Sequence, residues 1–170
     1  PDGYSLLMGA TSTIAANVSL YPKLGFHPVK DFAPVSQIAT GAFVLAVHPS
    51  VKVNTLQEFV ELAKKSPGEL NFGSAGLGSP QQLHSEFFNQ LAGIRTNHIP
   101  YKGQAPAINA LMANEITFML ANPIVVLPLL RADKVRAIAV TGGRRSAQIA
   151  FTASPRTCQP TLSGPCCSPS

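Results

Sequence analysis

The chain has 170 residues, of which 45% are hydrophobic and 12% are charged, so it is long enough and apolar enough to bury a core. Its formal net charge is +5, but the 13 lysines and arginines are scattered and only 7% of the residues are aromatic. This composition argues against a nucleic-acid surface of interleaved basic and aromatic residues, and no apolar run reaches the roughly 20 residues that a membrane span needs.

The first part of the chain contains few regular elements. Residues 4–9, YSLLMG, read as a short buried strand. Residues 11–21 follow as a short helix with Ser12 or Thr13 as its N-cap. Proline punctuates residues 22–37, which we expect to cross the surface. The chain starts without methionine and without a secretory signal, so we interpret its N-terminus as truncated.

From residue 38 onward, apolar extended segments alternate with helical segments. Strands are expected at residues 38–50, 70–76, 97–103, 116–122 and 135–142. Helices are expected at residues 54–65, 80–92, 104–115 and 123–134. This order predicts an α/β fold with largely parallel strands.

Helical spacing also predicts which side of three helices is buried. Apolar residues three or four positions apart lie on one face of a helix and pack against the core. The residues expected to face inward are Leu56, Phe59, Val60 and Ala63 in the first helix, Leu83, Phe87 and Leu91 in the second, and Ala107, Ile108, Leu111 and Met112 in the third.

A glycine-rich turn, GSAGLGSP at residues 73–80, joins an expected strand to an expected helix. Its backbone N–H groups and the positive end of the helix dipole favour an anion. No lysine follows Gly78, as a P-loop requires, and Gly76 and Gly78 supply only the first half of a dinucleotide motif. The turn is therefore either an anion site or a turn that simply needs glycine.

The sequence lacks the residue patterns that serine hydrolysis and metal binding require. Ser79 and His84 lie on one expected helix without a G-x-S-x-G motif, so a serine hydrolase is not indicated. The four histidines are spread along the chain, and the three cysteines lie together between Cys158 and Cys167 without metal-site spacing. Neither a catalytic residue nor a metal site is therefore expected.

Several sequence blocks together resemble the receptors of tripartite tricarboxylate transporters, also called Bug receptors. The blocks are PDGYSLLMG, YPKLGFHPVKDFAPVSQIA, LNFGSAGLGSPQQL, HIPYKGQAPAINALMANEITFML and VRAIAVTGGRRS, and the resemblance covers residues 1–148. It implies a periplasmic-binding-protein-like (type II) α/β fold of two lobes that close on a small organic anion. It also implies a periplasmic location and the membrane permease subunits as partners, with no enzymatic activity, metal, cofactor or nucleic acid.

The resemblance implies one nearly complete lobe and one fragmentary lobe. Residues 1–42 correspond to a fragment of lobe one, residues 43–136 to lobe two, and residues 137–149 to a return strand to lobe one. Residues 150–170 do not resemble the family, and we interpret them as an aberrant or disordered tail that a frameshift produced. We therefore expect an impaired fragment of a carboxylate receptor.

The resemblance also assigns a ligand site, because the turn at Gly73–Ser79 matches one of two family turns that hold a carboxylate. The expected contacts are the backbone of Ala75, Gly76 and Gly78, the side chains of Ser74 and Ser79, and the residues Thr11, Ser12, Tyr101 and Asn122. The alternative role of Thr11 and Ser12 is to cap their own helix. Ala121 stands where many members have aspartate, which favours a plain carboxylate over an amino acid.

Two other functions remain open from the residues alone. An α/β enzyme that binds a phosphorylated substrate could use the same turn, although no acid–base pair accompanies it. A solute sensor or interaction module is the other alternative.

Overall fold

The computed structural model describes residues 3–10 and 12–142, so Thr11, residues 143–149 and the tail lie outside the described residues. Its helices are η1 (Ser12–Ala16, a π-helix), α1 (Asn17–Leu20), α2 (Leu56–Lys65), α3 (Pro80–Ala92), α4 (Gln104–Met112) and α5 (Pro123–Arg131). Its strands are β1 (Val44–Val47), β2 (Asn71–Ser74), β3 (Asn97–Pro100), β4 (Phe118–Ala121) and β5 (Arg136–Val140). Among these helices, none combines the length and apolarity that crossing a bilayer requires.

The five strands form one mixed sheet in the order β3-β2-β4-β1-β5. β2 pairs in parallel with β3 and β4, whereas β1 pairs antiparallel with β4 and β5. Four strands therefore share one direction and β1 runs in the opposite one. The predicted α/β fold is confirmed, with β1 as an exception to its largely parallel strands, because an apolar run does not reveal strand direction.

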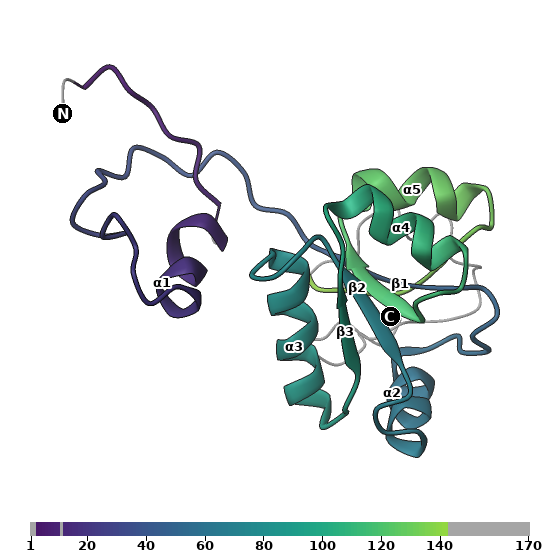
Figure 1. Cartoon of the computed structure of the whole chain (residues 1–170). Coiled ribbons are helices and arrows are strands. Elements are labelled where there is room, and N and C mark those ends of the chain that lie inside the picture. Colours follow the sequence, from purple (N-terminus) through teal and green to yellow (C-terminus); the bar gives the residue numbers. More distant parts are fainter. Residues whose placement is uncertain (1–2, 11, 143–170) are drawn as a thin grey trace, which may run out of the picture.

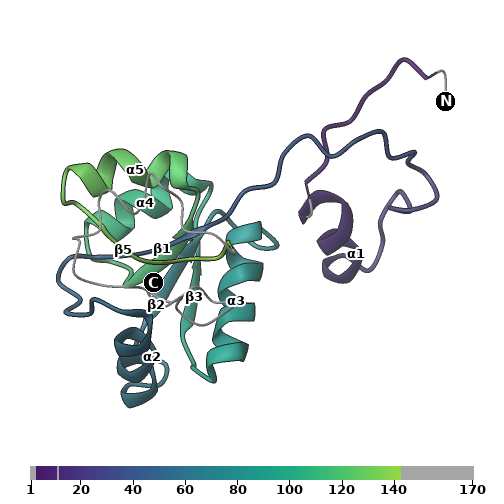
Figure 2. The same ribbon diagram turned by 180° about the vertical axis from the view of Figure 1, so that it is seen from behind.

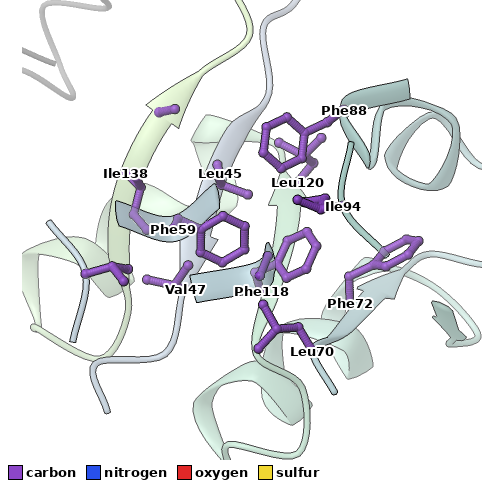
Figure 3. Packing of buried hydrophobic residues seen from close by; sticks show 13 residues of the cluster. Leu45, Val47, Phe59, Leu70, Phe72, Phe88, Ile94, Phe118, Leu120 and Ile138 are labelled. Atoms are coloured by element: carbon purple, nitrogen blue, oxygen red, sulfur yellow. The ribbon is translucent and has the colours of Figure 1, made fainter. Parts of the chain in front are cut away.

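Helices cover both faces of the sheet (Figure 1). Successive strand residues point to opposite faces, so Phe118 of β4 joins one apolar cluster and Met119 joins the other. α2 and α3 supply Phe59 and Phe88 to the first cluster, which Figure 3 shows around Phe118. α4 supplies Leu111 to the cluster on the opposite face. Because both faces are covered, β1 and β4 are buried along their whole length.

The ends of α2 and α3 lie where the sequence predicts them. The Thr55 hydroxyl accepts a hydrogen bond from the N–H three residues later at 3.2 Å, and the Ser79 hydroxyl does the same at 3.4 Å. Pro80 occupies the first turn of α3, and Gly93 ends it in the left-handed conformation with φ of 63°. These signals are local, which is why the sequence locates both helices well.

The predicted inward faces of α2 and α4 are confirmed. Phe59, Ala63, Ala107, Ile108 and Leu111 are buried, and Leu56, Val60 and Met112 are partly buried against the same clusters.

The predicted inward face of α3 is wrong. Leu83, Phe87 and Leu91 are 39%, 60% and 68% exposed. The residues that α3 buries are instead Gln81, Ser85, Phe88 and Asn89.

Two tertiary contacts explain why α3 buries a different face from the predicted one. The Phe88 ring packs against Phe59, with ring centroids 6.3 Å apart. On the same side of the helix, the Asn89 side-chain amide donates to the Thr96 hydroxyl at 2.8 Å. Contacts with distant residues, and not the number of apolar side chains on a face, therefore decide which side of α3 is buried.

Residues 3–42 extend away from the sheet, as Figures 1 and 2 show from opposite sides. The predicted strand at residues 4–9 is wrong: these residues have no regular structure, and Tyr4 and Met8 are 91% and 80% exposed. Within the described residues the sheet consists of β1 to β5 and does not include this segment, which therefore gains no strand ladder. The predicted helix that follows is present as η1 and α1, and residues 22–37 are irregular as expected.

The first strand of the sheet, β1, begins at Val44. The expected boundary between residues 136 and 137 falls within β5, which pairs with β1 from Arg136 to Val140.

Candidate functional site

The glycine-rich turn lies where the strand order of the sheet reverses. β2 has β3 on one side and β4 on the other. The helix after β2 covers one face, and the helix before β4 covers the opposite face. In α/β sheets, ligands bind outside the carboxyl ends of the strands at such a reversal. Because the turn follows β2 and Asn122 follows β4, these two predicted site elements lie at this same edge.

The glycines of the turn are required by its geometry. Gly76 and Gly78 have φ values of 129° and 73°, where a residue with a side chain is strained. Gly73 is buried, and a Cβ atom there would collide with the side chain of Ile116.

The turn holds its shape through internal hydrogen bonds, which use two of the three predicted backbone donors. The Gly76 N–H donates to Ser74 Oγ at 3.2 Å, and the Gly78 N–H donates to Gln82 Oε1 at 2.6 Å. The N–H groups of Ala75 and Leu77 have no hydrogen-bond partner among the described residues. The unpaired donors are therefore Ala75, which the sequence predicts, and Leu77, which the sequence reasoning missed.

Ser74 lies beneath the turn and not on its surface. It is fully buried, and its hydroxyl lies 3.0 Å from the Gly76 carbonyl oxygen and 2.6 Å from Nε2 of His98. The His98 ring stacks on Phe72 with centroids 4.8 Å apart. Burial lowers the pKa of His98, and the nearby Glu86 carboxylate opposes this shift. Sequence reasoning missed His98, which is 24 residues from Ser74 in the chain.

The loop after β3 is bound to the turn by backbone hydrogen bonds. The Tyr101 N–H donates to the Ser74 carbonyl oxygen at 3.0 Å, and the Gly103 N–H donates to that of Ala75 at 3.2 Å. The Tyr101 ring lies beside Gly73, and burial raises the pKa of its hydroxyl, with a smaller contribution from Glu115. Lys102 between them is exposed.

Ser79 and Asn122 both cap helices that begin at this edge. The Ser79 hydroxyl accepts the Gln82 N–H, which leaves its own proton available to a ligand. Asn122 Oδ1 accepts the Ile124 N–H at 3.1 Å, and its side-chain NH₂ makes no hydrogen bond with the described residues. Asn122 is exposed, so this amide can reach a ligand.

The predicted contacts from the N-terminal segment are only partly described. Thr11 lies outside the described residues, and Ser12 is the first residue of η1. From the same segment, the Leu20 side chain of α1 lies against Gly78 of the turn.

The chain enters and leaves the sheet body beside this site. The Phe43 N–H donates to the Thr141 hydroxyl, and the Thr141 N–H donates to the Phe43 carbonyl oxygen, each at 2.9 Å. Val44 pairs with Ala121, which places Phe43 and Thr141 at the edge where Asn122 lies. Phe43 and Thr141 therefore lie side by side at this edge.

Among the described residues, this edge of the sheet presents hydrogen-bond donors but no buried lysine or arginine. The donors are two backbone N–H groups, a serine hydroxyl, an asparagine amide and the exposed Lys102 ammonium. Oriented donors of this kind hold a carboxylate or another small anion. No cluster of three or more His, Cys, Asp or Glu side chains suited to a metal ion is found in the described part of the chain.

Comparison with known proteins identifies relatives along most of the chain. The family model described as the tripartite tricarboxylate transporter family receptor matches residues 1–157. The chain is 34% identical over 146 residues to protein BugT of Bordetella pertussis, which covers 85% of this chain and 45% of BugT. It is 31% identical to a second B. pertussis protein, with 82% and 43% covered. The chain thus spans about 45% of the length of these relatives.

Solved structures with the same fold include two with bound carboxylates. A structure of a periplasmic transporter is 34% identical, with a TM-score of 0.74, 81% of this chain covered and 46% of the other. A Rhodopseudomonas palustris protein with adipate is 32% identical, with a TM-score of 0.69 and 80% and 48% covered. MatC of the same organism, with bound malate, is 28% identical, with a TM-score of 0.73 and 84% and 50% covered. The fold is therefore the periplasmic-binding-protein fold expected from the sequence.

Proposed function

Because the chain belongs to the tripartite tricarboxylate transporter receptor family, we propose that it is part of a periplasmic receptor that binds a small organic carboxylate at the turn 74–79. The receptor delivers this solute to the membrane permease of its transporter. Adipate and malate in two of the similar structures support a dicarboxylate as the solute class.

The unpaired N–H groups of Ala75 and Leu77 carry this proposal. They lie at the carboxyl edge of β2, at the strand-order reversal, and the neighbouring residues hold the turn open through their own hydrogen bonds. A carboxylate oxygen accepts two such donors without a buried counter-charge. Asn122 and the Ser79 hydroxyl supply further donors, and Tyr101 forms one wall.

The proposed receptor has two lobes that close over the solute. Residues 43–142 form the sheet body, which we assign to lobe two, and residues 3–42 belong to lobe one. The adjacent connections at Phe43 and Thr141 support a hinge, because two neighbouring crossings allow one body to rotate against another. The turn lies next to this hinge, where closure excludes water from the ligand.

Thermal unfolding of the full chain with added ligands tests the proposal. Malate and adipate are expected to raise the melting temperature with the logarithm of ligand concentration once it exceeds the dissociation constant, because ligands that bind the folded state stabilise it. Inorganic phosphate at the same concentration and ionic strength is the control. Stabilisation by phosphate alone would instead favour the binding of a phosphorylated substrate.

A further inference from the structure

The single proton of the Ser74 hydroxyl has two possible acceptors, the Gly76 carbonyl oxygen and His98 Nε2. This hydroxyl lies within hydrogen-bond distance of the Gly76 N–H, the Gly76 carbonyl oxygen and His98 Nε2, at 3.2, 3.0 and 2.6 Å. A hydroxyl donates one proton and accepts at two lone pairs. If it donates to the Gly76 carbonyl oxygen, then His98 Nε2 must carry a proton and donate to it. If Nε2 carries no proton, the hydroxyl donates to His98. The Gly76 carbonyl oxygen then loses its hydrogen bond from Ser74.

The imidazole is held in place for this contact. Its ring stacks on Phe72 at 4.8 Å with an interplanar angle of 26°, and Phe72 is fully buried. Ser74 and Phe72 are two residues apart on β2, so their side chains point to the same face of the sheet. His98 is therefore fixed between an immobile ring and the hydroxyl that supports the turn.

Gly76 is the residue through which this contact reaches the proposed ligand donors. It lies between Ala75 and Leu77, whose N–H groups have no partner in the described residues. Its φ of 129° helps to set how the peptide group that carries the Leu77 N–H is turned relative to the preceding one. Any change in how Ser74 holds Gly76 therefore changes where the Leu77 N–H points relative to the Ala75 N–H.

We propose that His98 is a positioning residue of the turn, which fixes the Ser74 hydroxyl and through it the conformation of Gly76. Its importance for ligand affinity rests on the proposed function, but its effect on the turn does not. His98 thus acts on the site without contacting the solute.

Amide hydrogen exchange of the full chain, without ligand, tests this coupling. His98→Phe keeps an aromatic ring over Phe72 but removes Nε2, and Ser74→Ala removes the hydroxyl. Ser74→Ala removes the acceptor of the Gly76 N–H and is expected to increase its exchange by about five- to tenfold, the loss expected for one hydrogen bond. His98→Phe leaves this acceptor in place but no longer fixed, and is expected to give a smaller increase. The double variant is expected to equal Ser74→Ala, since His98 acts on Gly76 only through the hydroxyl that this substitution removes.

His98→Gln is the matched variant, because its side-chain amide can take the place of Nε2 beside Ser74. It is expected to restore exchange at Gly76 to nearly the wild-type rate, while amides of β1 serve as the internal control. An unchanged Gly76 rate in His98→Phe would overturn the proposal. So would an equal rise at Gly76 and β1 in both His98 variants, because His98 would then be only a packing residue.

Titration of the same variants with malate separates the two proposals. If the Gly76 rates change as expected but malate binds neither the wild type nor His98→Gln, the positioning role stands and the carboxylate function fails. If malate binds the wild type and His98→Phe equally well, with unequal Gly76 rates, the link between turn conformation and affinity is contradicted.

Discussion

At the residue scale, the glycines of the turn hold conformations that other residues resist. Gly76 has a φ of 129°, and a Cβ atom there would lie 3.4 Å from the Tyr101 carbonyl oxygen. The strain, and not a lack of space, therefore dominates the effect of a substitution. This separates Gly76 from glycines such as Gly41, where a Cβ atom would meet open space.

Gly76→Ala is expected to lower the free energy of unfolding by about 1–3 kcal/mol, through strain in a sparsely populated backbone region. It should also weaken malate binding, because the Leu77 N–H is reoriented. Gly41→Ala is the control and is expected to change stability by less than about 0.5 kcal/mol. Chemical denaturation and calorimetric titration measure both effects. Equal stability of the two variants would contradict the account of the turn.

His98 makes stability depend on pH in a defined direction. Burial lowers its pKa in the folded chain below the ordinary value of 6.5. Below pH 6.5 the unfolded chain therefore binds more protons than the folded chain, and stability falls until the pH passes the folded pKa. His98→Gln is expected to lose less of its melting temperature than the wild type between about pH 7.5 and pH 5. Identical losses in both proteins would show that His98 contributes nothing to this dependence.

At the element scale, α3 shows which features a sequence predicts and which it does not. Its two ends follow from Ser79, Pro80 and Gly93, because capping involves only neighbouring residues. Its buried face depends on Phe59 and Thr96, which belong to other elements. The same distinction explains why the turn was predicted but His98 was missed, since their contact joins two strands.

Substitution of the two adjacent phenylalanines of α3 tests directly which face of this helix is buried. Phe88 is 5% exposed and contacts Phe59, whereas Phe87 is 60% exposed. Phe88→Ala is expected to cost about 3–5 kcal/mol of stability, from lost burial and the remaining cavity. Phe87→Ala is expected to cost less than about 1 kcal/mol. Denaturant unfolding of the two variants is the measurement, and a larger loss for Phe87→Ala would support the face predicted from helical spacing.

At the scale of the whole molecule, the site follows from the topology of the sheet. The turn and Asn122 come from different parts of the chain and meet because β2 and β4 are parallel neighbours. Phe43 and Thr141, which flank β1 and β5, lie at the same edge. The sequence resemblance predicted the receptor fold and the turn. The direction of β1 and this adjacency of the connections depend on strand pairing, which periodicity does not report.

The N-terminal segment of the molecule exposes several large apolar side chains. Tyr4, Leu6 and Met8 are at least 80% exposed, and Val35 is 83% exposed. Exposed apolar residues in one segment mark a surface that other protein normally covers. The chain spans about 45% of the length of its relatives, which supports the proposal that this segment belongs to a larger lobe.

An amide chemical-shift titration of the isotopically labelled full chain with malate tests the central claim most directly. The account predicts that the largest shifts occur at the Ala75 and Leu77 N–H groups, with smaller shifts at Lys102 and the Asn122 side-chain amide. It also predicts saturation at about millimolar ligand, which corresponds to about −4 kcal/mol. Shifts confined to residues away from the turn, or equal shifts with inorganic phosphate, would contradict the claim that these backbone donors bind a carboxylate.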